Sequence, residues 1–402
     1  MTSRFVAVWL VPLLGACPHP SAPRSHPEPR AGLLRVEPIP RRLYVSPQLT
    51  LQGEFGQLLF HLNLHNEGER PLRVRRVVLE FLTMPSGQLL SRLVLEEPLL
   101  RRRLRPVGWI VMHDRQTIAA AHRYRGMLQR SKGDTLVPPG EAISLTHQVM
   151  FDRPANLPQR IRCTVLHDAG ESAAQIEVLT YQQRTALRLP VRGRWWVIGG
   201  HRYDDDHHAS VILDSQSFAY DLGVTGRGQS TCEGDPSRNS SYYANGQPVV
   251  AAADGVVTAV HDNVPENSPV GQRPTWQSIL RRPLDLGGNH VVVKHGAREF
   301  SAYMHLRPGI EVRTGQAVKQ GDVLGLCGNS GNSLETHLHF QLQDGPDPLT
   351  AVGLPARFGD FTIHWGHVEL YVSAARPMPL PQRLVVEPGR TEHAVDVGQV
   401  LR

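Results

Sequence analysis

The chain has 402 residues, 40% of them hydrophobic, and its 43 Lys and Arg against 37 Asp and Glu give a formal net charge of +6. This apolar content is enough for a sizeable core and excludes global disorder, and the length allows two domains. Basic clusters at 73–76 and 101–105 could meet an anionic polymer. No aromatic-interleaved basic motif accompanies them, so we expect solvated surface and no nucleic-acid partner.

Residues 1–17, MTSRFVAVWLVPLLGAC, have the pattern of an export signal. One Arg precedes an apolar stretch that is too short to cross a bilayer as a stable helix. The ending Leu14-Gly15-Ala16-Cys17 resembles a bacterial lipobox, so we expect cleavage and lipidation at Cys17, with attachment to a membrane; an ordinary cleaved signal is the alternative. The Pro- and Ser-rich residues 18–33 predict a flexible linker.

Residues 34–185 predict a β-sandwich-like accessory domain. Apolar and polar residues alternate in four segments separated by turn signals, at 57–66, 72–82, 141–151 and 159–168. Residues 115–128 have the pattern of a helix instead. His113 and His122 lie near this helix, and we interpret them as ordinary surface or packing residues.

Residues 186–402 predict a second, antiparallel β domain, rich in Gly and short Val and Ile runs. Asp254-Gly255 lies between two apolar runs and predicts a tight turn. The turn-rich segments 225–246 and 262–288 are long for connections in a compact domain, which is typical of functional loops. Residues from about 356 return to strand-like patterning.

The second domain contains a pair of cysteines and a further pair of histidines. Cys232 and Cys327 could form a disulfide, although the sequence does not establish it. His364 and His367 are three residues apart, a spacing that splits the faces of a strand, so we discount them as a metal site.

The segment THLHFQL at 336–342 has the residue types of a strand. Side chains alternate along a strand, so His337 and His339 project to one face while Leu338 and Phe340 enter a core. Two polar residues on a solvated face would give the same pattern. The histidine pair therefore needs partners before it indicates a metal site.

Such partners occur elsewhere in the second domain. A catalytic zinc commonly has three protein ligands and one open position. Asp221 lies in an apolar context that is unfavourable for a carboxylate unless something pairs with it. One imidazole of His207 or His208, Asp221 and one imidazole of the His-x-His segment would supply the three ligands, and His305 is a further histidine in apolar surroundings.

In this order along residues 200–350, the segments HH, SFAYDLG, GQPVVAAADGVVTAV, GNHVVVKHG, SAYMHLRPG and GNSGNSLETHLHFQL resemble the LytM/lysostaphin-type zinc endopeptidases of peptidase family M23. The resemblance implies an antiparallel β-sheet metallopeptidase domain with zinc ligands at His208, Asp221 and His339. It also implies catalytic roles for His305 and His337. The first histidine stands farther from Asp221 than in compact members of the family, which leaves His207 as an alternative ligand.

The resemblance further implies an exported zinc metalloendopeptidase of the cell envelope that hydrolyses peptide bonds in bacterial peptidoglycan. His337 could act as general base, while His305 could stabilise the oxyanion or pass a proton to the leaving amine. The alternatives are a non-catalytic regulator that binds a cell-wall hydrolase or a wall peptide, and a β-sandwich lipoprotein with structural duties. The sequence leaves open which peptide bond is cut and whether the substrate is the cell's own wall or a foreign one. It also leaves open the disulfide state and the oligomeric state.

Overall fold

The fold consists mainly of antiparallel β-strands, seen here in a computed structural model. The structure describes residues 33–39, 42–50, 53–105, 134–151, 157–200, 213–296 and 298–400. The predicted signal at 1–17, Cys17, most of the predicted linker, His113, His122, the predicted helix at 115–128 and both candidate ligands His207 and His208 lie outside these residues. No described helix is long and apolar enough to span a membrane.

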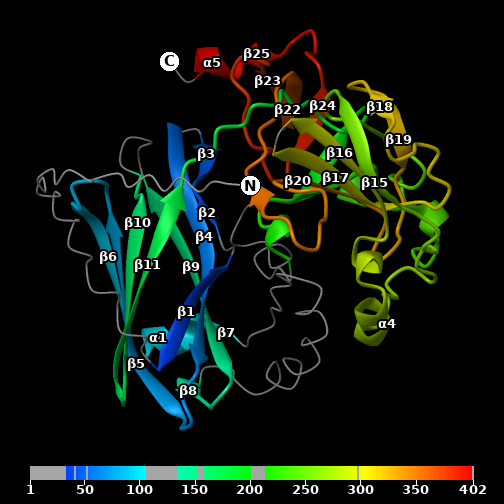
Figure 1. The fold of residues 1–402 in the computed structure, drawn as a ribbon. Coiled ribbons are helices and arrows are strands. Elements are labelled where there is room, and N and C mark those ends of the chain that lie inside the picture. Colours follow the sequence, from blue (N-terminus) through cyan, green and yellow to red (C-terminus); the bar gives the residue numbers. More distant parts are fainter. Residues whose placement is uncertain are drawn as a thin grey trace, which may run out of the picture. The chain divides into compact units, whose positions relative to one another are not determined.

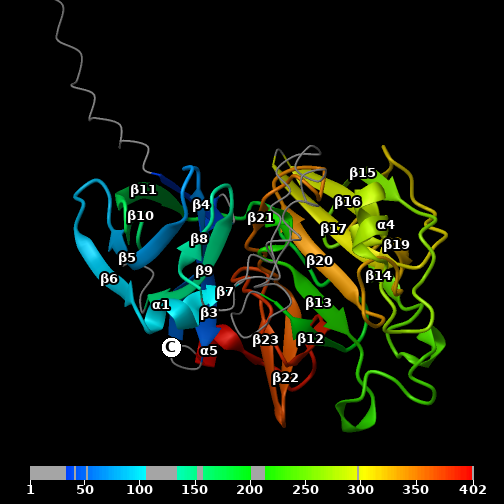
Figure 2. The same cartoon turned by 90° about the horizontal axis from the view of Figure 1, so that it is seen from below.

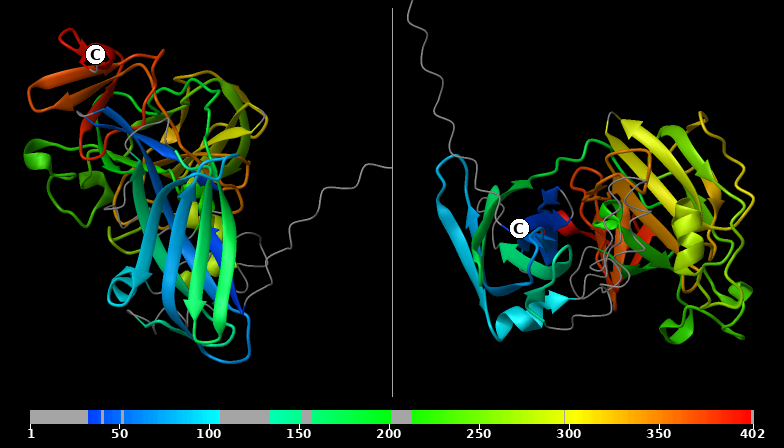
Figure 3. Two further views of the ribbon diagram at one scale, coloured as in Figure 1. Left: turned by 90° about the vertical axis from the view of Figure 1, so that its left-hand side faces the viewer. Right: turned by 60° about the horizontal axis from the view of Figure 1, so that its bottom comes forward.

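The first half of the described chain forms two sheets (Figures 1 and 3). One has the order β1-β4-β9-β7 with β3 beside β4, and the other has the order β2-β11-β10-β5-β6 with β8 beside β5. Their strands are β1 (Leu34–Ile39), β2 (Leu43–Tyr44), β3 (Ser46–Thr50), β4 (Gly53–Asn66), β5 (Leu72–Leu82), β6 (Leu89–Glu96), β7 (Leu104–Arg105), β8 (Leu136–Val137), β9 (Ala142–Phe151), β10 (Arg160–His167) and β11 (Gly170–Leu179), with helix α1 (Leu99–Arg103) after β6.

A single hydrophobic core fills the space between these two sheets. Phe60 and Leu62 of β4 alternate with polar neighbours and are fully buried, as are Phe81 of β5 and Val165 of β10. Alternate residues of each strand therefore point to the same core, which is the pattern of a β-sandwich. The predicted sandwich-like fold is confirmed, and the four segments with alternating residues correspond to β4, β5, β9 and β10.

The second half forms one large sheet of order β18-β15-β16-β17-β20-β13-β12-β24-β22-β23-β25, with β21 beside β20, and a small sheet of β14 and β19 (Figure 2). The strands are β12 (Trp195–Gly199), β13 (Tyr220–Gly223), β14 (Pro248–Val250), β15 (Gly255–His261), β16 (Asn289–Gly296), β17 (Glu299–Leu306), β18 (Ala317–Val318), β19 (Val323–Leu326), β20 (Leu338–Gln343), β21 (Gly353–Leu354), β22 (Phe361–Trp365), β23 (Val368–Val372), β24 (Val385–Pro388) and β25 (Val395–Asp396). The helices here are η2 (Asp214–Gln216), η3 (Arg227–Gln229), η4 (Asn239–Ser241), α4 (Trp276–Arg281), η5 (Pro283–Gly287) and α5 (Val397–Val400).

The two faces of the large sheet differ at its centre. Tyr220, Tyr303, Leu338 and Phe340 are buried in one hydrophobic core. Met304 belongs to a separate, smaller cluster on the other face. The expectation that Leu338 and Phe340 enter a core is confirmed, and the neighbouring positions of the same strands are left for the opposite face.

Several details of the second half differ from the sequence prediction. The strands on either side of Asp254-Gly255 do not pair with each other, because β14 pairs with β19 and β15 pairs with β16. The segment 262–288 is not a plain loop, since it contains α4 and η5. Cys232 and Cys327 are free, so the suggested disulfide is wrong. The predicted domain boundaries stay a prediction.

Candidate active site

Two of the predicted metal ligands meet on adjacent strands. The register of β13 and β20 places Asp221 opposite His339. Nδ1 of His339 lies 3.0 Å from Oδ1 of Asp221, and both residues are buried. The prediction that something must pair with the Asp221 carboxylate is therefore confirmed.

His337 lies one residue before β20 and faces the same pair. Its Nδ1–H donates to the carbonyl oxygen of Glu335 at 2.8 Å, which leaves Nε2 facing the site. Nε2 lies 3.5 Å from Oδ1 of Asp221, is buried and has no hydrogen-bond partner among the described residues. A buried polar atom without a partner is costly and points to a function for this atom.

His305 reaches the site through an irregularity of β17. The register between β16 and β17 shifts between Asn289 and Val291, and His305 has φ +63°. Regular alternation would turn His305 to the same side as Tyr303, into the core. The irregular backbone places its ring 4.9 Å from that of His337 and 5.8 Å from that of His339 instead. A left-handed conformation at a non-glycine residue costs about 1–3 kcal/mol and clusters at functional sites.

The Gly-rich segment 328–335 anchors both of these histidines. Nδ1–H of His305 donates to the carbonyl oxygen of Ser330 at 2.8 Å, so this segment holds His305 at one end and His337 at the other. The Ser330 hydroxyl donates to the Leu306 carbonyl and accepts from the backbone N–H of Asn289. Backbone carbonyls thus fix both rings, and each ring presents Nε2 to the site.

The surroundings of the two anchored histidines shift their pKa values in opposite directions. Burial lowers the pKa of His305 well below its ordinary value, and the neighbouring imidazoles of His337 and His339 add to this effect. Burial also opposes the charged form of His337, but the Asp221 carboxylate and Glu335 together outweigh burial and raise the pKa of His337. The Asp221 carboxylate therefore favours the protonated form of the nearer imidazole.

The residues that are described fit part of a zinc site. Nδ1 of His339 and the carboxylate of Asp221 lie 3.0 Å apart, close to the ~3.3 Å edge of a tetrahedron with zinc bond lengths of about 2.0–2.1 Å. Within the described ranges, no group of three or more His, Cys, Asp or Glu is arranged to hold a metal ion. The third predicted ligand, His208, lies outside them. Imidazole and carboxylate are the ligand types of catalytic zinc, so the described pair supplies two of the three expected ligands.

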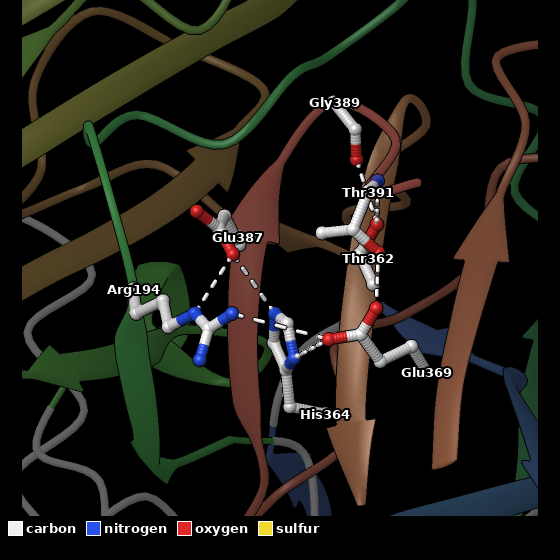
Figure 4. A network of polar contacts seen from close by, with 7 residues as sticks. All are labelled: Arg194, Thr362, His364, Glu369, Glu387, Gly389 and Thr391. Carbon is white, nitrogen blue, oxygen red and sulfur yellow. Dashed lines mark hydrogen bonds and ion pairs between the residues drawn. The ribbon is translucent and has the colours of Figure 1, made fainter. Parts of the chain in front are cut away.

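His364 is engaged elsewhere. It lies on β22, and its two ring nitrogens contact Glu369 at 3.2 Å and Glu387 at 3.0 Å, with Arg194 beside both carboxylates (Figure 4). His367 follows in the exposed turn between β22 and β23. Both ring nitrogens of His364 already have charged partners, which agrees with discounting this pair as a metal site.

Several residues that were not predicted from the sequence also position the site. Gln341 and Gln343 follow His339 at spacings of two and four residues, and Oε1 of Gln341 lies 2.9 Å from Nε2 of His339. The same alternation that paired His337 with His339 could have found them. Asn289 is also fully buried, and it joins Val264, Leu306 and Ser330 by hydrogen bonds. No local pattern indicates these contacts.

Comparison with known proteins matches the region that holds His305, His337 and His339 of this site. The family model described as Peptidase family M23 matches residues 241–350. The chain is 32% identical over 107 residues to the peptidoglycan DD-endopeptidase ShyA of Vibrio cholerae, which is 27% of this chain and 20% of ShyA. It is 32% identical over 122 residues to an uncharacterized metalloprotease of Haemophilus influenzae, which is 30% of this chain and 21% of that protein. The chain thus spans about a fifth of the length of these relatives.

A solved structure gives a weaker similarity. The catalytic domain of the antimicrobial peptidase lysostaphin from Staphylococcus simulans is 17% identical, with a TM-score of 0.22. The similarity covers 40% of this chain and 88% of that domain.

Proposed function

Because the chain carries a domain of peptidase family M23, we propose that it is a zinc-dependent endopeptidase that hydrolyses peptide bonds in bacterial peptidoglycan. The observation that carries the proposal is the meeting of Asp221 and Nδ1 of His339 beside two imidazoles whose Nδ1 atoms are anchored on carbonyls. The substrate class is supported by the relative named a peptidoglycan DD-endopeptidase.

Asp221, His339 and His208 would hold the zinc ion, with His207 as the alternative to His208. The chemistry that zinc supplies in such sites is polarisation of the scissile carbonyl and acidification of the attacking water. Asp221 and His339 are fixed on two paired strands, so their separation does not depend on a loop. Rigid placement of ligands is what a hydrolytic site requires.

The two anchored histidines would move the protons. We assign the general base to His337, because its buried Nε2 has no hydrogen-bond partner among the described residues and lies beside Asp221. His305, whose ring lies 4.9 Å from that of His337, would stabilise the developing oxyanion or transfer a proton to the leaving amine. Since both rings are held through Nδ1, proton transfer at Nε2 requires no rotation of either ring.

The location of the enzyme is proposed from the sequence of residues 1–17. We propose export to the cell envelope, with attachment to a membrane through a lipidated Cys17. Such an anchor would keep the peptidase near the wall. The segments 225–246 and 262–288 are our candidates for selecting the peptide substrate.

The experiment that tests the function measures bound zinc by elemental analysis and the release of new amines from purified peptidoglycan. It compares the chain with His339→Ala and with His367→Ala, a histidine in an exposed turn outside the site. We expect about one zinc per chain and amine release for the parent and for His367→Ala, and loss of both in His339→Ala. A folded parent chain without zinc or hydrolysis would contradict the proposal. Zinc without hydrolysis would favour the regulator instead.

A further inference from the structure

Three side chains form a continuous row along the site-facing side of β20. His339, Gln341 and Gln343 alternate with core residues, and the two glutamines are fully buried. Nε2 of His339 contacts Oε1 of Gln341 at 2.9 Å. Nε2 of Gln341 donates to Oε1 of Gln343, and Nε2 of Gln343 donates to the carbonyl oxygen of Gly345 at 2.7 Å.

The last member of this row fixes the direction of all the others. The Gly345 carbonyl can only accept a hydrogen bond, so Gln343 must turn its amide NH2 toward it. Oε1 of Gln343 then faces Gln341, which in turn must present its own NH2 to Gln343 and its Oε1 to His339. An acceptor at this position requires a proton on Nε2 of His339.

We propose that Gln341 and Gln343 are positioning residues that orient His339 by accepting at its Nε2, which leaves Nδ1, the nitrogen that faces Asp221, as the one available to a metal ion. The inference rests on the proposed function for the identity of the metal. The partner of a ligating imidazole normally fixes its tautomer, and losing that partner typically reduces metal affinity about 10–100-fold. Here the tautomer of His339 would also depend on Gln343, a residue that does not contact His339.

Two neutral amides serve this role without adding charge. The buried face already carries the Asp221 carboxylate, and neutral amides add no further charge to it. A glutamine side chain, however, can rotate so that its amide oxygen and nitrogen exchange places. For Gln341, the hydrogen bond to Gln343 opposes this rotation. The chain therefore needs Gln343 and the Gly345 carbonyl to keep Gln341 in the orientation that accepts.

The test uses the full chain with Gln343→Leu and the double variant Gln341→Glu with Gln343→Leu. In Gln343→Leu the Gln341 amide is free to invert and to donate to Nε2, so we expect about tenfold weaker zinc binding in competition with a chelator. In the double variant a carboxylate can only accept from His339, so we expect most of the affinity to return. Ser301→Ala is the control, because Ser301 is a buried polar residue of β17 that donates to Tyr303 on the opposite face.

A second readout does not depend on zinc. Nitrogen-15 spectra of the metal-free chain should show a protonated Nε2 at His339 in the parent and an unprotonated Nε2 in Gln343→Leu. Wild-type zinc affinity in a folded Gln343→Leu variant, or no recovery in the double variant, would overturn the inference. If the parent binds no zinc but its Nε2 proton depends on Gln343, the proposed function fails while the positioning role stands.

Discussion

The imidazole rings of His305 and His337 lie 4.9 Å apart, and each is held through Nδ1 by a backbone carbonyl of the same short segment, 328–335. His305 lies near the end of β17 and His337 precedes β20, and these two strands also pair directly, with Met304 opposite His339. The orientation of the two rings of the candidate proton-transfer groups therefore depends on the backbone conformation of a Gly-rich loop as well as on strand pairing.

Gly331 should be the most sensitive position of that loop. It has φ +75°, and a Cβ atom there would lie 2.3 Å from the backbone nitrogen of Gly288. We expect Gly331→Ala to reduce hydrolysis strongly and to lower the free energy of unfolding by more than the ~1–2 kcal/mol of left-handed strain alone. Urea unfolding and peptidoglycan hydrolysis measure both effects. Gly309→Ala is the matched control, because Gly309 has φ +95° with open space around its Cβ position. Equal losses of hydrolysis and of stability in the two variants would show that Gly331 is not a specially sensitive position.

Asp221→Asn should separate metal binding from folding. The amide keeps the shape of the side chain but removes the negative charge that faces His339 and His337. We expect zinc affinity to fall by more than the roughly 100-fold upper range for outer-shell partners. Because the Asp221 carboxylate raises the pKa of His337, that pKa should also fall in the metal-free variant, as an NMR titration would show. An unchanged titration of His337 would mean that Asp221 does not control its charge.

Glu299 should make stability depend on pH. Burial opposes its carboxylate, but hydrogen bonds from Thr185, Tyr181 and the backbone of Arg184 outweigh burial and lower its pKa. A lowered folded-state pKa means that the stabilisation is fully present above the unfolded value of about 4.3 and is lost as pH falls through the folded value. We expect Glu299→Gln to cost about 2–3 kcal/mol near pH 7 and progressively less below about pH 4.5.

Denaturant unfolding of the parent and Glu299→Gln across this range measures the difference. Glu311→Gln, at an exposed carboxylate, is the control and should show little change. A difference that stays constant from pH 7 down to pH 3 would exclude the ionised Glu299 as its source.

The three described cysteines should differ in reactivity. Burial raises the pKa of Cys163 to about 12 and also raises that of Cys327, whereas Cys232 is half-buried. Since the thiolate is the reactive form, a thiol reagent should modify Cys232 first and the other two only after unfolding. Mass spectrometry of the labelled native protein checks this. A peptide containing Cys232 joined to Cys327 would show that the two pair after all.

Cys17→Ser should release the protein from membranes if Cys17 carries the proposed anchor. Loss of the acyl chains removes the apolar surface that inserts into a bilayer, and stable anchoring depends on that surface. Fractionation of producing cells, with radiolabelled palmitate to detect the lipid, compares Cys17→Ser with the parent. If both forms are found in the soluble fraction and neither carries the radiolabel, an ordinary cleaved signal would be favoured.

The sequence by itself determined the β character of the chain, because alternating apolar residues encode strands directly. It also predicted, from a spacing of two, that His337 and His339 share a face, and it indicated from the apolar context that Asp221 needs a partner. The match of residues 241–350 to peptidase family M23 rests on the same local information.

Only the tertiary structure decided how His305 joins the site. Alternation along β17 would place it in the core with Tyr303, and a register shift against β16 turns it toward His337. The anchoring carbonyls of Ser330 and Glu335 and the amide row that ends at Gly345 likewise depend on backbone groups, whose positions no residue type reveals. A sequence specifies which side chains are available, whereas their directions are set by strand register and loop conformation, which depend on contacts between distant segments.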